Sequence, residues 1–132
     1  MILVDTNVLL DVAGNDPQWA DWSLAQLDRL SLTNRLVINP VIYAELSIGY
    51  ERIEEVEAAL VAVGLDVRPI PHEALFLAGK VFRAYRQRGG LKSGVLPDFF
   101  IGAHAAVEGW TVLTRDPRRY RNDFPSLNLI CP

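Results

Sequence analysis

The sequence predicts an α/β fold in which a mainly parallel sheet is covered by helices on both faces. Short apolar and β-branched runs alternate along the chain with longer segments whose apolar residues recur at helical spacing. Strands that alternate with helices pair in parallel, because each helix returns the chain to the end of the sheet where it started. The 132 residues are enough for one domain, residues 1–132, with a single buried core.

In the first half, Ile2-Leu3-Val4 is an apolar run that ends at Asp5, as expected for a buried strand that leads into a helix. An amphipathic helix is expected over 18–32 and a second strand at 36–38. Asn39-Pro40 is a typical helix start, since Asn caps the helix and Pro takes its first position. A fourth helix, 51–63, then ends at Gly64.

In the second half, residues 66–70 form a weak strand, and Pro69 indicates that it lies at an edge of the sheet. The periodicity of 73–88 predicts a long helix that stops at Gly89-Gly90, with its start capped by His72. The remaining expected elements are a basic loop at 91–96, a helix at 97–106 and strands at 111–114 and 127–130.

Composition narrows the class of protein. Half of the residues are hydrophobic, 22% are charged, and no apolar run approaches the ~20 residues of a membrane span. The start has no signal-peptide pattern and the lone Cys131 cannot form an internal disulfide, so we expect a soluble, cytoplasmic protein with no membrane partner. The net charge of −3 is uneven: residues 1–82 have five Lys/Arg and twelve Asp/Glu, whereas residues 83–132 have eight and four. Phosphates could therefore bind the second half.

Four acids lie at strand ends or on helices, where they could form a site. Asp5 and Asp116 follow strands, Asp98 opens a helix, and Glu45 has apolar neighbours at helical spacing. Sites in parallel sheets form where the strands end, so these carboxylates can meet there. Taken singly, Asp5, Asp98 and Asp116 could be helix caps or first-turn acids, and Glu45 could be a neutral core residue.

A shared cation explains all four acids at once, because buried carboxylates that converge repel one another. Oxygen-only ligands favour Mg²⁺ or Mn²⁺ over zinc. Neither histidine is placed as a ligand, and His104 in particular reads as a packed core residue. Asp11 lies near a polar break and is interpreted as surface charge.

The chain resembles the PIN-domain family, and within it the VapC toxins of toxin–antitoxin pairs. The likeness spans nearly the full length and rests on Val4-Asp5-Thr6-Asn7-Val8-Leu9-Leu10, Ala44-Glu45-Leu46, Pro97-Asp98-Phe99-Phe100-Ile101-Gly102-Ala103-His104-Ala105 and Leu113-Thr114-Arg115-Asp116-Pro117. It implies a three-layer α/β/α fold with a five-stranded sheet. It also implies a catalytic site in which Asp5, Glu45, Asp98 and Asp116 hold Mg²⁺ or Mn²⁺, supported by Thr6, Asn7 and Thr114. Endoribonuclease activity, a VapB-type antitoxin and a homodimer follow from the same resemblance.

Basic residues near the fourth acid are candidates for holding RNA phosphates, with solvated surface charge as the alternative: Arg115, Arg118, Arg119 and Lys92. Some relatives have a further acid shortly after the position of Asp116, where this chain has Arg118, Arg119 and Tyr120, so we expect one metal ion. Two rival functions stay open. One is a PIN-like nuclease of RNA maturation, and the other is a non-catalytic interaction module that exposes Trp19 and Trp22.

Overall fold

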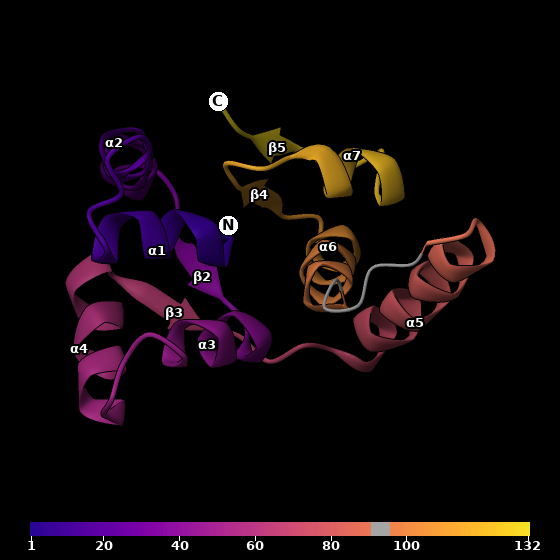
Figure 1. Cartoon of the computed structure of the whole chain (residues 1–132), viewed down its shortest axis with the longest axis horizontal. Coiled ribbons are helices and arrows are strands. Elements are labelled where there is room, and N and C mark those ends of the chain that lie inside the picture. Colours follow the sequence, from indigo (N-terminus) through magenta and orange to yellow (C-terminus); the bar gives the residue numbers. More distant parts are fainter. Residues whose placement is uncertain (91–95) are drawn as a thin grey trace.

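The computed structural model of the chain describes residues 1–90 and 96–132. Strands and helices alternate as expected (Figure 1). The strands are β1 (Ile2–Val4), β2 (Leu36–Ile38), β3 (Leu65–Val67), β4 (Thr111–Leu113) and β5 (Leu129–Ile130). The helices are α1 (Thr6–Ala13), α2 (Ala20–Ser31), α3 (Pro40–Ser47), α4 (Ile53–Val63), α5 (His72–Gln87), α6 (Leu96–Glu108) and α7 (Arg118–Asp123).

The five strands form one sheet in the order β3-β2-β1-β4-β5, and every pair is parallel. The predicted fold class, a three-layer α/β/α arrangement around a parallel five-stranded sheet, is confirmed. Figure 1 shows α1, α2 and α4 on one side of the sheet and α5, α6 and α7 on the other. Helix α3 contacts both α1 and α6, and so it joins the two groups at one end of the sheet.

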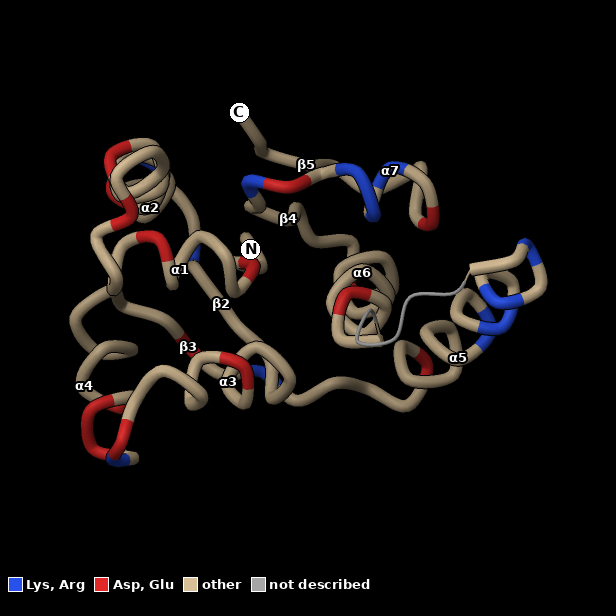
Figure 2. Tube along the Cα trace, in the orientation of Figure 1, with Lys and Arg blue, Asp and Glu red and all other residues tan. Residues whose placement is uncertain are grey.

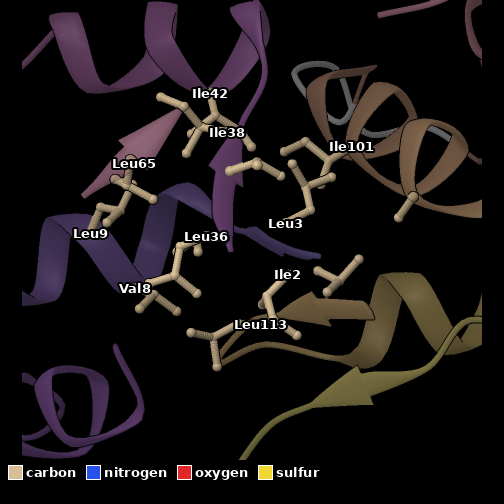
Figure 3. Packing of buried hydrophobic residues seen from close by; sticks show 14 of the residues in the cluster. Ile2, Leu3, Val8, Leu9, Leu36, Ile38, Ile42, Leu65, Ile101 and Leu113 are labelled. Atoms are coloured by element: carbon tan, nitrogen blue, oxygen red, sulfur yellow. The ribbon is translucent and has the colours of Figure 1, made fainter. Parts of the chain in front are cut away.

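The centre of the sheet is fully apolar. All three residues of β1 and all three of β2 are buried, which is the pattern of strands covered on both faces. Leu3 of β1 and Ile38 of β2 belong to the same buried cluster as Val8, Ile42 and Ile101 from the helices (Figure 3). The buried core fixes the positions of the strands, and therefore also of the first and fourth acids, which follow the ends of β1 and β4.

Local signals account for most element boundaries. The Asn39 side chain accepts a hydrogen bond from the backbone N–H of Ile42, 3.0 Å away, which confirms the expected cap of α3. Gly64 ends α4 in the left-handed region with φ of 80°, as expected for a glycine C-cap. The weak strand lies at an edge of the sheet as Pro69 predicts, but it covers 65–67 and ends before the proline.

One local prediction was wrong, and one helix was missed. His72 does not cap α5, because Pro71 occupies the cap position and makes no side-chain capping bond. Helix α7 was not predicted, although Tyr120 and Phe124, four residues apart and both buried, carry a helical spacing. The expected loop 91–96 falls almost entirely outside the described residues. Within the described residues, no helix is both long and apolar enough to cross a membrane.

A close contact between α6 and the segment after α7 gives a stability prediction. A Cβ at Gly102 would lie 2.4 Å from Phe124 Cε2, so Gly102→Ala should force the ring or the helix to move. We expect a loss of about 1–3 kcal/mol in the free energy of unfolding. Gly79→Ala on α5 is the matched control, since nothing lies within 4 Å of its added Cβ. It should raise stability by up to ~1 kcal/mol through helix propensity. Urea titration of both variants measures the difference, and an unaffected Gly102→Ala would contradict the packing.

Candidate active site

A cleft of about 790 Å³ opens at the end of the sheet where β1 and β4 finish, and the four predicted acids line it: Asp5, Glu45, Asp98 and Asp116. Asp5 directly follows β1 and Asp116 lies in the turn after β4. Glu45 comes from α3 and Asp98 from the first turn of α6. The sheet topology thus brings four distant segments to one place, as expected where parallel strands end.

Asp5 is the most buried of the four, with 6% of its surface exposed. Its side chain makes no capping bond to α1, so the capping alternative is wrong for this residue. Three donors converge instead on its Oδ2 atom: the Thr114 hydroxyl at 2.8 Å, the Tyr120 hydroxyl at 3.0 Å and the Asn7 amide at 3.3 Å. Burial raises the pKa of Asp5, and the hydroxyl donors oppose that rise because they favour the ionised form.

Glu45 is half-buried and accepts a 2.6 Å hydrogen bond from the Thr6 hydroxyl. Its apolar neighbour Ile48 is 86% exposed and lines the cleft, whereas Ile42 on the same face is buried in the core, so Glu45 lies where the core meets the cleft. The resemblance implies that Thr6 or Asn7 holds the first acid and Thr114 the last; here Asn7 and the Thr114 hydroxyl both donate to Asp5, and Thr6 donates to Glu45. Thr114 also receives the Asp116 backbone N–H at 3.1 Å, which ties the first and fourth acids to one hydroxyl.

The acids lie close enough to one another to affect each other's pKa. The pKa of Asp98 is raised to about 6, first by burial and then by the charges of Asp5 and Glu45, while Arg119 opposes the rise. The pKa of Asp116 is lowered, because Arg118 donates to both of its carboxylate oxygens at 3.0 and 3.1 Å. The pKa values of Asp5 and Asp98 are thus both raised, whereas Arg118 compensates the charge of Asp116 directly.

The predicted phosphate-binding residues occupy different settings. Arg118 is 85% exposed at its side chain and rests on Asp116, and Arg119 is 20% exposed and lies 3.7 Å from Asp98. Both line the cleft. Arg115 is instead paired with Asp11 at 2.8 Å and lies over the Trp19 ring, and Lys92 falls outside the described residues. Binding of substrate by these four residues stays a prediction.

Comparison with known proteins agrees with this geometry. The family model of the PIN domain matches residues 2–125. The chain belongs to the PIN-domain family. PIN domains are nucleases, which supports the assignment of this chain to the hydrolases that act on nucleic acids. A search of proteins with curated functions found no significant match.

Solved structures share the PIN fold at low identity. VapBC2 from Rickettsia felis, bound to a promoter DNA fragment, has a TM-score of 0.77 at 22% identity, with 100% of this chain and 99% of that chain covered. VapBC-1 from nontypeable Haemophilus influenzae gives 0.72 at 21%, covering 99% and 98%. FitAcB from Neisseria gonorrhoeae gives 0.69 at 23%, covering 98% and 96%. At such identities the likeness concerns the fold.

PIN-domain nucleases generally use divalent metals, and the donor set here fits a hard cation. All four acids offer oxygen ligands, and the raised pKa of Asp98 reflects negative charge that a cation would neutralise. As they lie, no three acid, histidine or cysteine side chains of residues 1–90 and 96–132 are grouped closely enough to hold an ion. His104 is fully buried against Trp110 and Asn39, which confirms it as a packed residue.

Three residues of the cleft were missed by sequence reasoning: Tyr120, Asp123 and Arg88. Tyr120 is 1% exposed and donates to Asp5, and burial raises its pKa well above the ordinary value, so it remains a donor. The helical spacing of Tyr120 and Phe124 was the one available signal, because it would have placed Tyr120 on a buried helix face.

The interpretation of Asp11 as surface charge was wrong. Asp11 is 3% exposed, accepts from the Ser23 hydroxyl at 3.0 Å and pairs with Arg115 on both oxygens at 3.0 and 2.8 Å. The pair links α1 and α2 to the turn after β4 that carries Asp116. The polar residues at 14–17 suggested exposure, but the fold returns the chain over this helix.

Asp11→Ala should therefore lower stability, since it leaves the Arg115 guanidinium and the Ser23 hydroxyl without their partner. We expect a loss of about 2–3 kcal/mol, below the ~3–5 of a fully buried pair because water reaches Arg115. Asp28→Ala, an exposed acid on α2, is the matched control and should change stability by less than about 0.5 kcal/mol. Thermal and urea unfolding compare the two, and equal effects would show that the buried pair contributes nothing.

Proposed function

We propose that this chain is a metal-dependent endoribonuclease that acts as the toxin of a VapBC-type pair. The observation that carries the proposal is the convergence of Asp5, Glu45, Asp98 and Asp116 on one cleft, in a chain of the PIN-domain family. The raised pKa of Asp98 supports it, because this rise comes in part from the neighbouring acids.

The proposed cofactor is Mg²⁺ or Mn²⁺, held by Asp5, Asp98 and Asp116 together with Glu45. When bound, the ion would lower the pKa of a water nucleophile and offset charge on the scissile phosphate. The chain's own residues have separate tasks. Thr114, Tyr120 and Asn7 fix the orientation of Asp5 by binding one of its oxygens, and the two hydroxyls oppose the rise in its pKa that burial causes. Thr6 does the same for Glu45.

RNA phosphates are proposed to meet Arg118 and Arg119, which line the cleft beside the acids, with Lys92 and Arg115 as weaker candidates. Arg119 lies over two adjacent rings, with its guanidinium carbon 4.9 Å from the Tyr85 ring centre and 5.6 Å from that of Phe99. A guanidinium whose plane is fixed in this way presents its donors in a defined direction.

The toxin role and the antitoxin partner rest on the neighbouring structures, which are described as complexes of the VapBC type. The homodimer is proposed on the same basis. The partner proposal has a direct test: the chain expressed alone should arrest growth, and co-expression of an antitoxin encoded beside it should restore growth. Unimpaired growth during expression of active, folded protein would favour the RNA-maturation alternative.

Asp98→Asn should abolish cleavage, with a fall of about 10²–10³-fold or more, because it removes a negative charge that would hold the cation beside the reacting phosphate. Tyr120→Phe keeps every acid and removes one hydrogen bond to Asp5, so we expect a smaller fall of about tenfold. Incubation with total RNA, with Mg²⁺ or with EDTA, followed by mapping of the cut ends, measures both effects and identifies the target.

Circular dichroism should show that both variants fold as the wild type does. Arg121→Gln, on α7 but outside the described lining of the cleft, is the surface control and should cleave normally. Wild-type rates in Asp98→Asn with added Mg²⁺ would contradict the proposed site.

A further inference from the structure

Asp123 is a fifth acid of the cleft, and its environment differs from that of the other four. It lies at the last position of α7, its side chain is 1% exposed, and it lines the cleft. A buried carboxylate is costly unless cations compensate it. Both of its oxygens face arginines, so its compensation is already supplied within the chain.

The two arginines come from different elements. Arg88, at the end of α5, donates to Oδ1 of Asp123 at 2.6 Å. Arg119, one turn earlier on α7, places Nη1 3.5 Å from Oδ2. That oxygen makes no hydrogen bond within the described residues, so the second contact is an ion pair of looser geometry. Asp123 therefore connects the ends of α5 and α7 across the cleft wall.

Without Asp123, both arginines would have other acids to bind. Arg119 already lies 3.7 Å from Asp98, and five carboxylates against three arginines line the described part of the cleft. An untethered guanidinium would thus be drawn onto Asp98 or Asp116, where it would compete with any phosphate or cation. Asp123 opposes this, since it pairs with both guanidinium groups.

We propose that Asp123 is a positioning residue that holds Arg88 and Arg119 as a paired phosphate-binding surface in the cleft, beside the four acids. Arg88 is suited to the task, because its side chain is 57% exposed while one donor is fixed on Asp123. Arg119 is fixed on its other side by the Tyr85 and Phe99 rings. The inference rests on the proposed function, in that the ligand is a single-stranded RNA backbone.

Figure 2 places this surface in the whole chain. Lys and Arg gather on the second half of α5 and around α7, whereas most acids lie on α1 to α4 and in the loops between them. The proposed pair joins these two basic segments, which are far apart in the sequence.

The test is RNA binding without cleavage. A short, unstructured RNA labelled with a fluorophore is titrated in EDTA over about 0.05–0.2 M salt, and anisotropy gives the affinity and its salt dependence. Arg88→Gln should weaken binding and reduce the slope of log K against log salt by about 0.7, the value for one phosphate contact on a single strand. Arg86→Gln, two residues earlier and outside the described lining, should change neither.

Asp123→Asn gives the sharpest result, because two explanations predict opposite signs. If Asp123 is only a negative charge near RNA, its removal tightens binding. If it positions the arginines, binding weakens by about five- to tenfold, as a lost phosphate contact requires. A purely structural role would lower stability without coupling to Arg88, so Arg88→Gln is repeated in the Asp123→Asn background. We expect it to change affinity by less than about twofold there.

Tighter or unchanged binding in folded Asp123→Asn would overturn the proposal, as would additive effects of the two substitutions. If Asp123→Asn does not fold, unchanged affinity in Arg88→Gln overturns it alone. Absence of salt-dependent RNA binding by the wild type also counts against it. Failure of the proposed function looks different: RNA is bound with the expected slope, but Mg²⁺ produces no cuts.

Discussion

Repulsion among four carboxylates at one end of a parallel sheet is the constraint on which the rest of the structure depends. Each acid has a compensating partner from the chain itself: hydroxyls and an amide on Asp5, a hydroxyl on Glu45, and guanidinium groups beside Asp98 and Asp116. The fold can therefore form around this much negative charge. Asp98 has the most distant partner, and burial together with the charges of Asp5 and Glu45 raises its pKa to about 6.

The division of charge along the sequence becomes a division in space. Acidic residues predominate in the half that forms α1 to α4, and basic residues in the half that forms α5 to α7, with the cleft between them. Because the net charge is only −3, the overall composition gives no sign of this. A nucleic acid would be attracted by the basic residues of α5 to α7, but their electric field extends only about 8–10 Å at physiological salt.

The fold and the four acids were predictable because both depend on short-range patterns. Apolar runs define strands, strand ends define the edge where sites form, and Asn39-Pro40 marks a helix start. The burial of Asp11 and Asp123 was not predictable, because residues far away in sequence decide it, and the helical spacing that marks Tyr120 as buried does not reveal its partner. Asp11 meets Arg115, Tyr120 meets Asp5, and Asp123 meets Arg88. No periodicity within α1 or α7 encodes these pairs.

The strand order has a consequence for how the protein is made. Residues 2–4 form the central strand β1, yet one of its two neighbours is β4, residues 111–113. During translation one edge of β1 stays unpaired until β4 has been synthesised. Non-local parallel pairing of this kind is slow to form. Asp98, Asp116 and Tyr120 also arrive late. A ribosome that stops before Tyr120 thus releases a fragment without a complete cleft, so that hydrolytic capacity is tied to completion of the polypeptide.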